Sequence, residues 1–392
     1  MYRRGFLSFS SLGLAALSGA ALSCYGSRWL NSGSPTPATA HFASPGPLPV
    51  IKASAQRIVA VDVGIRPFRP QGPRVELERF GAKQVIHCYG HGGSGWSLSW
   101  GAAAAALEFA KASGETNLAV IGCGAIGLTT AVLAQASGFN VRIYTKARMP
   151  DTYSSAASGV WTPDSRICAR EYATPQFQQM WEAQARFSFG QYQKLSGLPG
   201  EPVKWHTGFS LAATNAAGQG ALSAHEPEYP DLKQRIPDLL PPPLLLQANE
   251  HPFDLEHVRR YRQMGFNINA YSRILMLEFQ QAGGEIEIRE LRNLDDVQYI
   301  REKVMVNATG YGARALVEDA SIIPVRGQTA KLIPQPEVNY GISYPSENLF
   351  VVPRHDGILV QAQKVDDFGS EDTAVDLALS QAAVARLAKL FI

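Results

Sequence analysis

The sequence predicts an α/β fold that contains a Rossmann-like βαβ unit. Residues 118–121 form a short apolar run, residues 122–127 read Gly-Cys-Gly-Ala-Ile-Gly, and an apolar helical pattern follows through residue 134. A second apolar run covers residues 141–144 and has the length of a strand. The chain has 392 residues, 45% of them hydrophobic and 18% charged, so it can build the core of one large or two medium domains. Strand, tight turn, helix and strand in this order are typical of doubly wound folds.

Three glycines in this turn have the spacing of a dinucleotide-binding site. Gly122 permits the tight turn, Gly124 lets the backbone approach a pyrophosphate, and Gly127 lets the helix pack closely on the strand. The pyrophosphate would lie at the helix N-terminus beside Ala125 and Ile126, where free N–H groups favour an anion. The motif alone does not distinguish FAD from a nicotinamide cofactor.

Lys146 stands near the end of the second predicted strand, where an acidic residue usually holds the adenosine ribose. Three interpretations are open for this lysine. It contacts a ribose phosphate as in NADP enzymes, it reaches the FAD pyrophosphate, or it is a solvated surface residue.

The overall charge of the chain points to a small-molecule ligand. Lys and Arg number 36 against 34 Asp and Glu, so neither sign of charge dominates and we expect no nucleic-acid partner. The cysteines include no CxxC pair and no histidine at zinc-ligand spacing, which disfavours a metal site. They are Cys24, Cys88, Cys123 and Cys168. His87, His91 and Cys123 are interpreted as structural residues.

The N-terminus is predicted to be an export signal over residues 1–24. Arg3 and Arg4 precede an uncharged stretch rich in Leu, Ala and Ser, which resembles a twin-arginine signal. A membrane-spanning anchor is the alternative, and Cys24 resembles the lipid-bearing cysteine of a lipoprotein signal. We therefore expect export to the periplasm or cell surface, with any membrane attachment through the N-terminus, or a cytoplasmic protein if the signal is not used. The oligomeric state is left open.

Three more segments follow the glycine motif in a recognisable order. A hydroxyl-rich segment covers residues 152–161, a strand-like run at 304–307 leads to Thr309 and Gly310, and Pro-Val-Arg-Gly-Gln stands at 324–328. Together they resemble the D-amino acid oxidase family of FAD enzymes. The resemblance implies FAD as the cofactor, bound by the adenosine-side Thr309 and Gly310 and by the hydroxyl-rich segment, whose hydroxyls and amides donate to phosphate oxygens without adding charge. The residues implied in that segment are Thr152, Tyr153, Ser154, Ser158, Gly159 and Val160.

Two further segments resemble the family but stand in a different order. Residues 63–71 and 85–96 resemble segments near the C-terminus of family members, whereas here they precede the glycine motif. The helical pattern over 375–391 resembles the family's helix just before the first of these segments. We interpret this as a circular permutation, in which the chain is opened at one surface loop and joined at another. A rearranged gene product that does not fold, or two partial units that complete each other between chains, are the alternatives.

The resemblance implies a FAD-binding Rossmann-like domain and a substrate domain built on a mixed or antiparallel sheet. The predicted division is an export signal at 1–24, a disordered Pro- and Ser-rich linker at 25–50, a FAD-binding domain at 51–160 (the permuted segment 51–113, then the βαβ unit 118–160), a substrate domain at 161–266, a return to the FAD-binding domain at 267–320, and the substrate domain again at 321–392.

The resemblance also assigns substrate-binding roles. Arg66 would bind the substrate carboxylate with its planar guanidinium, and Gly93 would offer its carbonyl to the substrate amine. The amides at the start of the helix that follows would stabilise negative charge on reduced flavin. That cofactor-binding segment comprises Gly92, Gly93, Ser94, Gly95, Trp96 and Ser97. The implied reaction is hydride transfer from the substrate α carbon to flavin N5, reoxidation by dioxygen to hydrogen peroxide, and hydrolysis of the imino acid to a keto acid and ammonia.

Phe350 departs from the family pattern, which has a carboxylate-binding tyrosine at this place. Losing one hydrogen bond to a charged group weakens binding by about 1.5–3 kcal/mol, roughly one to two decades in affinity. Tyr344 is predicted to supply a replacement hydroxyl, and Arg354 and Lys364 to favour an acidic side chain. An oxidase for glycine, sarcosine or an imino acid is the alternative function, as is an exported flavin-binding protein without turnover.

Overall fold

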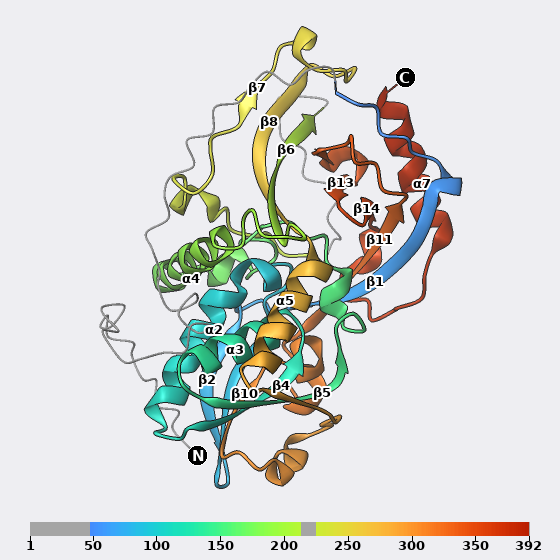
Figure 1. Ribbon diagram of the computed structural model, residues 1–392. Coiled ribbons are helices and arrows are strands. Elements are labelled where there is room, and N and C mark those ends of the chain that lie inside the picture. Colours follow the sequence, from blue (N-terminus) through green and yellow to red (C-terminus); the bar gives the residue numbers. More distant parts are fainter. Residues whose placement is uncertain (1–47, 213–224, 392) are drawn as a thin grey trace.

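The computed structural model describes residues 48–212 and 225–391, which form two sheets with helices packed against them (Figure 1). The predicted export signal, including Cys24, and nearly all of the predicted linker lie outside the described residues. Within the described ranges, no helix is both long enough and apolar enough to cross a membrane. The other three cysteines are buried free thiols.

The six-stranded sheet contains the predicted βαβ unit. Five of its strands, from β3 to β9 in spatial order, run parallel, and β2 pairs antiparallel with β3 at one edge. The strands in spatial order are β2 (Arg74–Phe80), β3 (Lys83–Tyr89), β10 (Val304–Asn307), β4 (Asn117–Cys123), β5 (Asn140–Arg148) and β9 (Glu285–Ile288). The strands predicted at 118–121 and 141–144 are thus confirmed as β4 and β5, and the glycine turn lies at the carboxyl end of β4.

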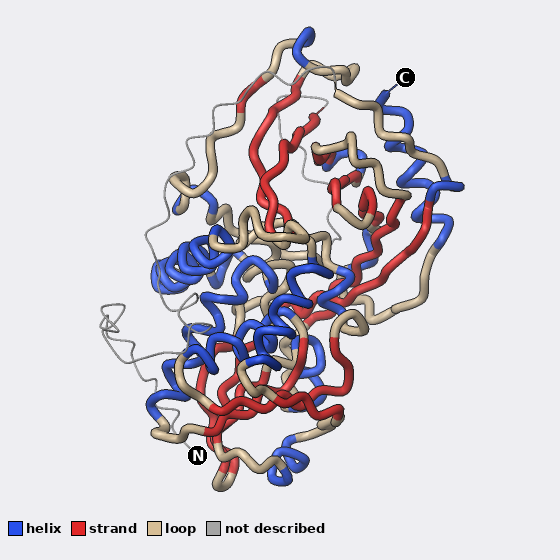
Figure 2. Tube along the Cα trace, viewed as in Figure 1, coloured by secondary structure: helices blue, strands red, loops and turns tan. Residues whose placement is uncertain are grey.

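Helices cover this sheet and build the larger core (Figure 2). The long helices are α2 (Gly95–Ala112), α3 (Ala125–Ala136), α4 (Pro175–Gln193) and α5 (Ile268–Gln281), and the short α6 (Ala313–Leu316) follows β10. Small side chains on α2 and α3, mostly alanine, allow these helices to pack closely on the parallel strands. A buried hydrogen bond from Trp100 Nε1 to Tyr271 Oη, 2.7 Å long, joins α2 to α5. The helix predicted to begin at residues 92–97 and the helical pattern predicted after the glycine turn are confirmed as α2 and α3.

The eight-stranded sheet is mostly antiparallel, with β12 and β6 as a parallel pair. In spatial order it contains β1 (Ile58–Phe68), β11 (Ile323–Leu332), β14 (Gly357–Ala362), β13 (Leu349–Arg354), β12 (Tyr340–Tyr344), β6 (Val203–Ala212), β8 (His257–Phe266) and β7 (Leu244–Leu245). One face packs against α7 (Leu377–Ala388), which is the helix predicted over 375–391. The opposite face carries the candidate site.

The N-terminal part of the described chain contributes to both sheets. Residues 51–113 were all predicted to belong to the FAD-binding domain, but β1 pairs with β11 along nearly its whole length and belongs to the eight-stranded sheet. The prediction was wrong for this strand. It rested on the motif around Arg66, and that motif does not indicate which of the two sheets the strand joins. Strands β2 and β3 and helix α2 do lie with the six-stranded sheet.

The beginning and the end of the described chain lie in one core. Ile51 and Leu387 are buried in the same apolar cluster, against which Leu390 packs. Tyr340 Oη also donates a 2.6 Å hydrogen bond to the carbonyl of Pro49. The segment that opens the fold therefore lies beside the helix that closes it.

Candidate active site

The glycine turn after β4 brings backbone segments closer together than side chains at these positions would allow. Gly122 has φ +105°, and a Cβ there would lie 2.6 Å from the carbonyl oxygen of Ala308. A Cβ on Gly127 would lie 2.0 Å from the carbonyl oxygen of Gly122, so α3 packs directly against the turn. The backbone N–H of Ala125, in the first turn of α3, donates to Ser154 Oγ at 3.1 Å. The N-terminus of α3 is therefore held open by small residues and faces a hydroxyl from the predicted flavin segment.

Three predicted cofactor segments meet at this end of α3. Trp96 Nε1 donates to the carbonyl of Ser154 at 2.9 Å, which joins α2 to the hydroxyl-rich segment. The N–H of Thr162 donates to Ser97 Oγ at 2.8 Å and fixes the end of the same segment. Gly159 has φ +77°, and a Cβ there would lie 2.6 Å from the carbonyl oxygen of Phe266. One region is thus lined by three predicted segments that are far apart in sequence, residues 92–97, 122–127 and 152–161.

The predicted adenosine-side residues lie next to the glycine turn. A Cβ built on Gly122 would be 3.3 Å from the Cα of Thr309, and Thr309 Oγ1 donates to Asn307 Oδ1 at 2.7 Å. Gly310 has φ +58° and approaches Pro67. Lys146 is exposed on β5, and no hydrogen bond or ion pair within the described ranges involves it. Its position is compatible with a cofactor contact and with a solvated surface lysine.

These residues fit FAD by the chemistry that they present. An open helix N-terminus and glycines in conformations that exclude a side chain suit a pyrophosphate, and the adjoining hydroxyls are uncharged donors for its oxygens. Among the described residues, no group of His, Cys, Asp and Glu has the arrangement of a metal site.

Gly92 and Gly93 lie against a loop that the sequence analysis did not single out. A Cβ on Gly92, which has φ +52°, would lie 1.9 Å from the carbonyl oxygen of Arg166. The N–H of Gly93 and the hydroxyl of Ser94 both donate to the carbonyl of Ser165, at 3.0 and 2.9 Å. The two glycines therefore serve to let residues 165–166 approach the start of α2.

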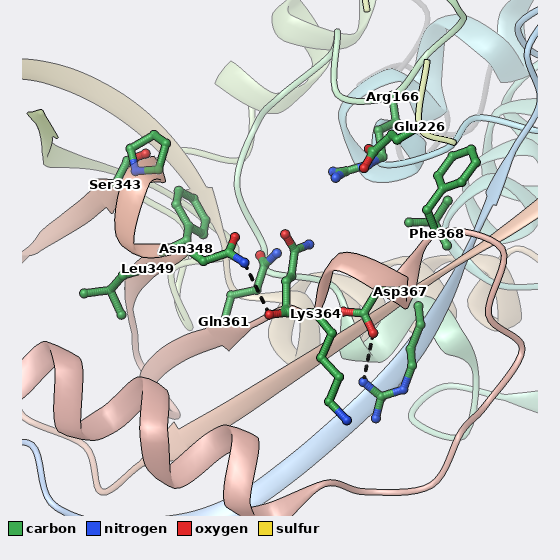
Figure 3. A pocket seen from close by; sticks show the side chains of 14 residues that line it. Arg166, Glu226, Ser343, Asn348, Leu349, Gln361, Lys364, Asp367 and Phe368 are labelled. Carbon is green, nitrogen blue, oxygen red and sulfur yellow. Dashed lines mark hydrogen bonds and ion pairs between the residues drawn. The ribbon is translucent and has the colours of Figure 1, made fainter. Parts of the chain in front are cut away.

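A cavity of about 220 Å³ opens on the face of the eight-stranded sheet that lies opposite α7 (Figure 3). Ser343, Phe350 and Gln361 are register partners on neighbouring strands and line it. Phe350 also packs with Val160 at the end of the hydroxyl-rich segment. The cavity therefore adjoins the predicted position of the flavin, as a substrate site must.

Arg66 lies on β1, and its side chain projects from the same face of the sheet. Side chains alternate along a strand, and Arg66 pairs with Val325, which lines the cavity. One Nη of Arg66 donates to the carbonyl of Arg326 at 2.9 Å, and a Cβ on Gly327 would lie 2.4 Å from both Nη atoms. Gly327 is thus the residue that makes room for the guanidinium. Burial and the nearby Arg166 guanidinium lower the pKa of Arg66 to about 10.

The other cations at the cavity have carboxylate partners. Arg166 Nε lies 2.8 Å from Glu226 Oε1, Arg326 lies 3.4 Å from Asp367, and Lys364 lies 2.5 Å from Asp376. Within the described ranges, no carboxylate lies at ion-pair distance from the Arg66 guanidinium. Arg66 is therefore the cation near this cavity that has no carboxylate partner within the described ranges, which suits it to bind an external carboxylate.

Several cavity residues were missed by sequence reasoning. Arg166, Glu226, Gln361 and Asp367 come from separate loops and strands that only the fold brings together. One signal was present, because Arg166 follows the hydroxyl-rich segment by only a few residues. A charged side chain at that distance from a predicted flavin segment is a candidate for substrate contact.

Two predicted substrate residues lie elsewhere. Tyr344 is 8% exposed and lies in the core on the α7 side of the sheet, whereas its neighbour Ser343 lines the cavity. The prediction that the Tyr344 hydroxyl replaces the missing tyrosine was wrong, since alternate residues of a strand face opposite sides. Arg354 pairs with Asp356 at 2.9 Å and donates to the carbonyl of Ala157 at 3.1 Å. It supports the hydroxyl-rich segment instead of lining the cavity.

Comparison with known proteins shows the family to which the chain belongs. The family model described as DAO, FAD dependent oxidoreductase, matches residues 117–392. A D-amino-acid oxidase of Streptomyces coelicolor is 32% identical over 225 residues, which are 55% of this chain and 58% of that protein. A D-amino-acid oxidase of Rubrobacter xylanophilus is 26% identical over 213 residues, 54% of this chain and 58% of that protein. The chain thus spans 58% of the length of each of these two relatives.

Two shorter or more distant similarities were also found. A D-aspartate oxidase of Talaromyces thermophilus is 53% identical over 47 residues, 12% of this chain and 13% of that protein. Among solved structures, an L-amino acid deaminase from Proteus vulgaris superposes with a TM-score of 0.44 at 13% identity, over 63% of this chain and 60% of that one.

Proposed function

Because the chain belongs to the DAO family of FAD-dependent oxidoreductases, we propose that it oxidises D-amino acids, with FAD as the cofactor and dioxygen as the electron acceptor. The observation that carries this proposal is Arg66, a cation without a carboxylate partner among the described residues, on the cavity face of the eight-stranded sheet. The bidentate geometry of a guanidinium suits a substrate carboxylate.

When bound, FAD would supply the hydride acceptor for the substrate α carbon and pass the electrons on to dioxygen. The residues of this chain would bind and orient. Arg66 holds the carboxylate, the α3 N-terminus and Ser154 hold the pyrophosphate, and the apolar contact between Val160 and Phe350 limits water at the reacting face. Overall, amino acid, dioxygen and water give keto acid, ammonia and hydrogen peroxide.

Peroxide release by the purified, FAD-loaded protein tests the proposal directly. We expect release with D-amino acids and not with their L-enantiomers. In Arg66→Met, loss of the charged bidentate contact of about 1.5–3 kcal/mol should raise KM by roughly one to two decades. Arg186→Met, which removes a partly exposed cation of a surface ion pair on α4, is the matched control and should keep wild-type KM. Wild-type turnover in Arg66→Met would overturn the role of Arg66.

Phe350 favours a second candidate, a flavin-binding protein without amino acid turnover. The cavity has an apolar ring where a hydroxyl would help to hold the carboxylate. This candidate predicts that the bound flavin is not reduced by any D-amino acid, by glycine, by sarcosine or by an imino acid. Reduction by glycine or sarcosine alone would instead favour an oxidase for small or secondary amines.

The circular permutation belongs to the same proposal. It is supported by the contact of Ile51 with the core of α7 and by β3 lying beside β10, which is far along the chain. A gene that places residues 51–113 after residue 391, joined by a short linker and opened near residue 115, should give a folded protein with wild-type flavin content. An unfolded product from this gene, beside a folded parent, would contradict the permutation.

A further inference from the structure

Arg166 is held over the cavity by an unusual backbone. Its φ is +49°, a left-handed conformation that is unfavourable for a residue with a side chain. The conformation is fixed from both sides, because the Arg166 carbonyl lies where a Cβ of Gly92 would be, and the Ser165 carbonyl accepts from Gly93 and Ser94. A strained residue that its surroundings fix in this way is a candidate for a functional role.

The side chain of Arg166 has donors to spare. Its Nε is bound to Glu226, whose side chain is 7% exposed and which also accepts from Tyr229 Oη at 2.8 Å. The guanidinium carbon lies 5.7 Å from the centre of the Tyr229 ring. Within the described ranges, Glu226 is the only carboxylate at ion-pair distance from Arg166, and the Tyr229 hydroxyl is a further hydrogen-bond partner of its guanidinium. A guanidinium carries five N–H donors, so donors remain for a ligand. Figure 3 shows Arg166 and Glu226 together on one side of the cavity, with Ser343 and Leu349 on another.

Arg166 lines the cavity, and Arg66 lies on the same face of the sheet, paired with the lining residue Val325. Phe68 faces the same side of β1 as Arg66 and packs against the Tyr229 ring, over which the Arg166 guanidinium lies, so the two guanidinium groups are neighbours. The repulsion between them contributes, after burial, to the lowered pKa of Arg66. A ligand with two carboxylates would relieve this repulsion. A basic side chain would not be matched, because the Glu226 and Asp367 carboxylates already accept from Arg166, Tyr229 and Arg326.

The rest of the lining agrees with an acceptor-bearing side chain. Ser343 on β12 and Gln361 on β14 line the cavity on either side of β13, and they supply a hydroxyl and an amide that can donate to carboxylate oxygens. The approximately 220 Å³ of the cavity is small, which suits a short side chain.

We infer that the preferred substrates are D-amino acids with a short acidic side chain, and that Arg166 binds the side-chain carboxylate while Arg66 binds the α-carboxylate. This inference rests on the proposed function and names its substrate class. Arg166 is then a specificity-determining residue, and Glu226 is a positioning residue that orients it.

The test compares kcat/KM for D-aspartate and D-glutamate with that for D-alanine and D-leucine in the FAD-loaded protein. We expect the acidic substrates to be preferred by at least tenfold. Arg166→Met should lower kcat/KM for D-aspartate by about a hundredfold and change that for D-alanine by less than threefold, and Arg166→Lys should restore part of the preference. Lys204→Met removes an exposed cation of β6 that is paired with Glu201. This control variant should leave the ratio of kcat/KM for D-aspartate to that for D-alanine unchanged.

Binding without turnover separates this inference from the proposed function. Calorimetric titration with succinate and with butyrate, which differ by one carboxylate, should show tighter binding of succinate to the wild type and equal binding to Arg166→Met. A preference for neutral or basic D-amino acids, or a succinate preference that survives Arg166→Met, would overturn the inference while leaving D-amino acid oxidation intact. Oxidation of no D-amino acid, with the succinate preference present, would instead overturn the proposed function and leave only the carboxylate-binding role of Arg166.

Discussion

Gly327→Ala tests whether the position of the Arg66 guanidinium determines activity. The new Cβ would lie 2.4 Å from both Nη atoms and 2.6 Å from Cζ of Arg66, so the guanidinium must move by about 1 Å to reach van der Waals distance. The atoms that must move are the end of a flexible side chain and not backbone, so the fold can absorb the change. We expect the free energy of unfolding to change by no more than about 1 kcal/mol.

The effect on catalysis should be much larger than the effect on stability. Moving the guanidinium weakens its 2.9 Å hydrogen bond to the Arg326 carbonyl and misplaces the substrate carboxylate. A misplacement of about 1 Å can cost roughly a hundredfold in rate, so we expect kcat/KM for the best D-amino acid to fall by one to two decades. The assay is peroxide release, with flavin content and thermal unfolding measured on the same samples.

A double-mutant cycle shows whether this effect acts through Arg66. If it does, Arg66→Met combined with Gly327→Ala should be no less active than Arg66→Met alone. Additive losses, or a Gly327→Ala variant with wild-type kcat/KM, would refute the assignment of Arg66 as the carboxylate anchor.

Three further predictions concern the cofactor, the substrate and the stability. In Gly122→Ala, the new Cβ would lie 2.6 Å from a backbone oxygen, at a residue with φ +105°. The free energy of unfolding should fall by about 1–3 kcal/mol, and the flavin absorbance per protein should decrease. Full flavin content would speak against the role of this turn. Phe350→Tyr should lower KM for D-amino acids by about tenfold if its hydroxyl reaches the carboxylate, and an unchanged KM would show that it does not. Burial lowers the pKa of His206 to about 4 from 6.5, so the unfolded state binds the extra proton between these values and stability falls as pH decreases through that window. Relative to His206→Gln, the wild type should lose up to about 2 kcal/mol of unfolding free energy between pH 7 and pH 5 in urea titrations, whereas equal losses would exclude His206 as the cause.

The sequence predicted the strand, turn and helix around the glycine motif because the signals for them are local. The apolar run before Gly122, the glycine spacing and the helical pattern after it all lie within one short stretch, and the structure has a strand and a helix there. Residues 92–97, which precede the glycine motif, were predicted from their own residue types to begin a helix, and this helix was confirmed as α2.

The substrate side was harder to predict because it depends on strand phase and on distant loops. Tyr344 and Ser343 are adjacent, and only the pairing of Ser343 with Phe350 decides which of them faces the cavity. Likewise, nothing near β1 in the sequence indicates that it pairs with β11. Arg166 and Glu226 meet only after folding, so neither carries a sequence signal of the pair.

An anaerobic absorbance spectrum of the purified protein, recorded before and after addition of a mixture of D-amino acids, tests the central claim most directly. The account predicts a flavin spectrum that is bleached by the D-amino acids and returns when dioxygen is admitted. A folded protein that binds no FAD, or a bound flavin that dithionite bleaches but no D-amino acid does, would contradict it.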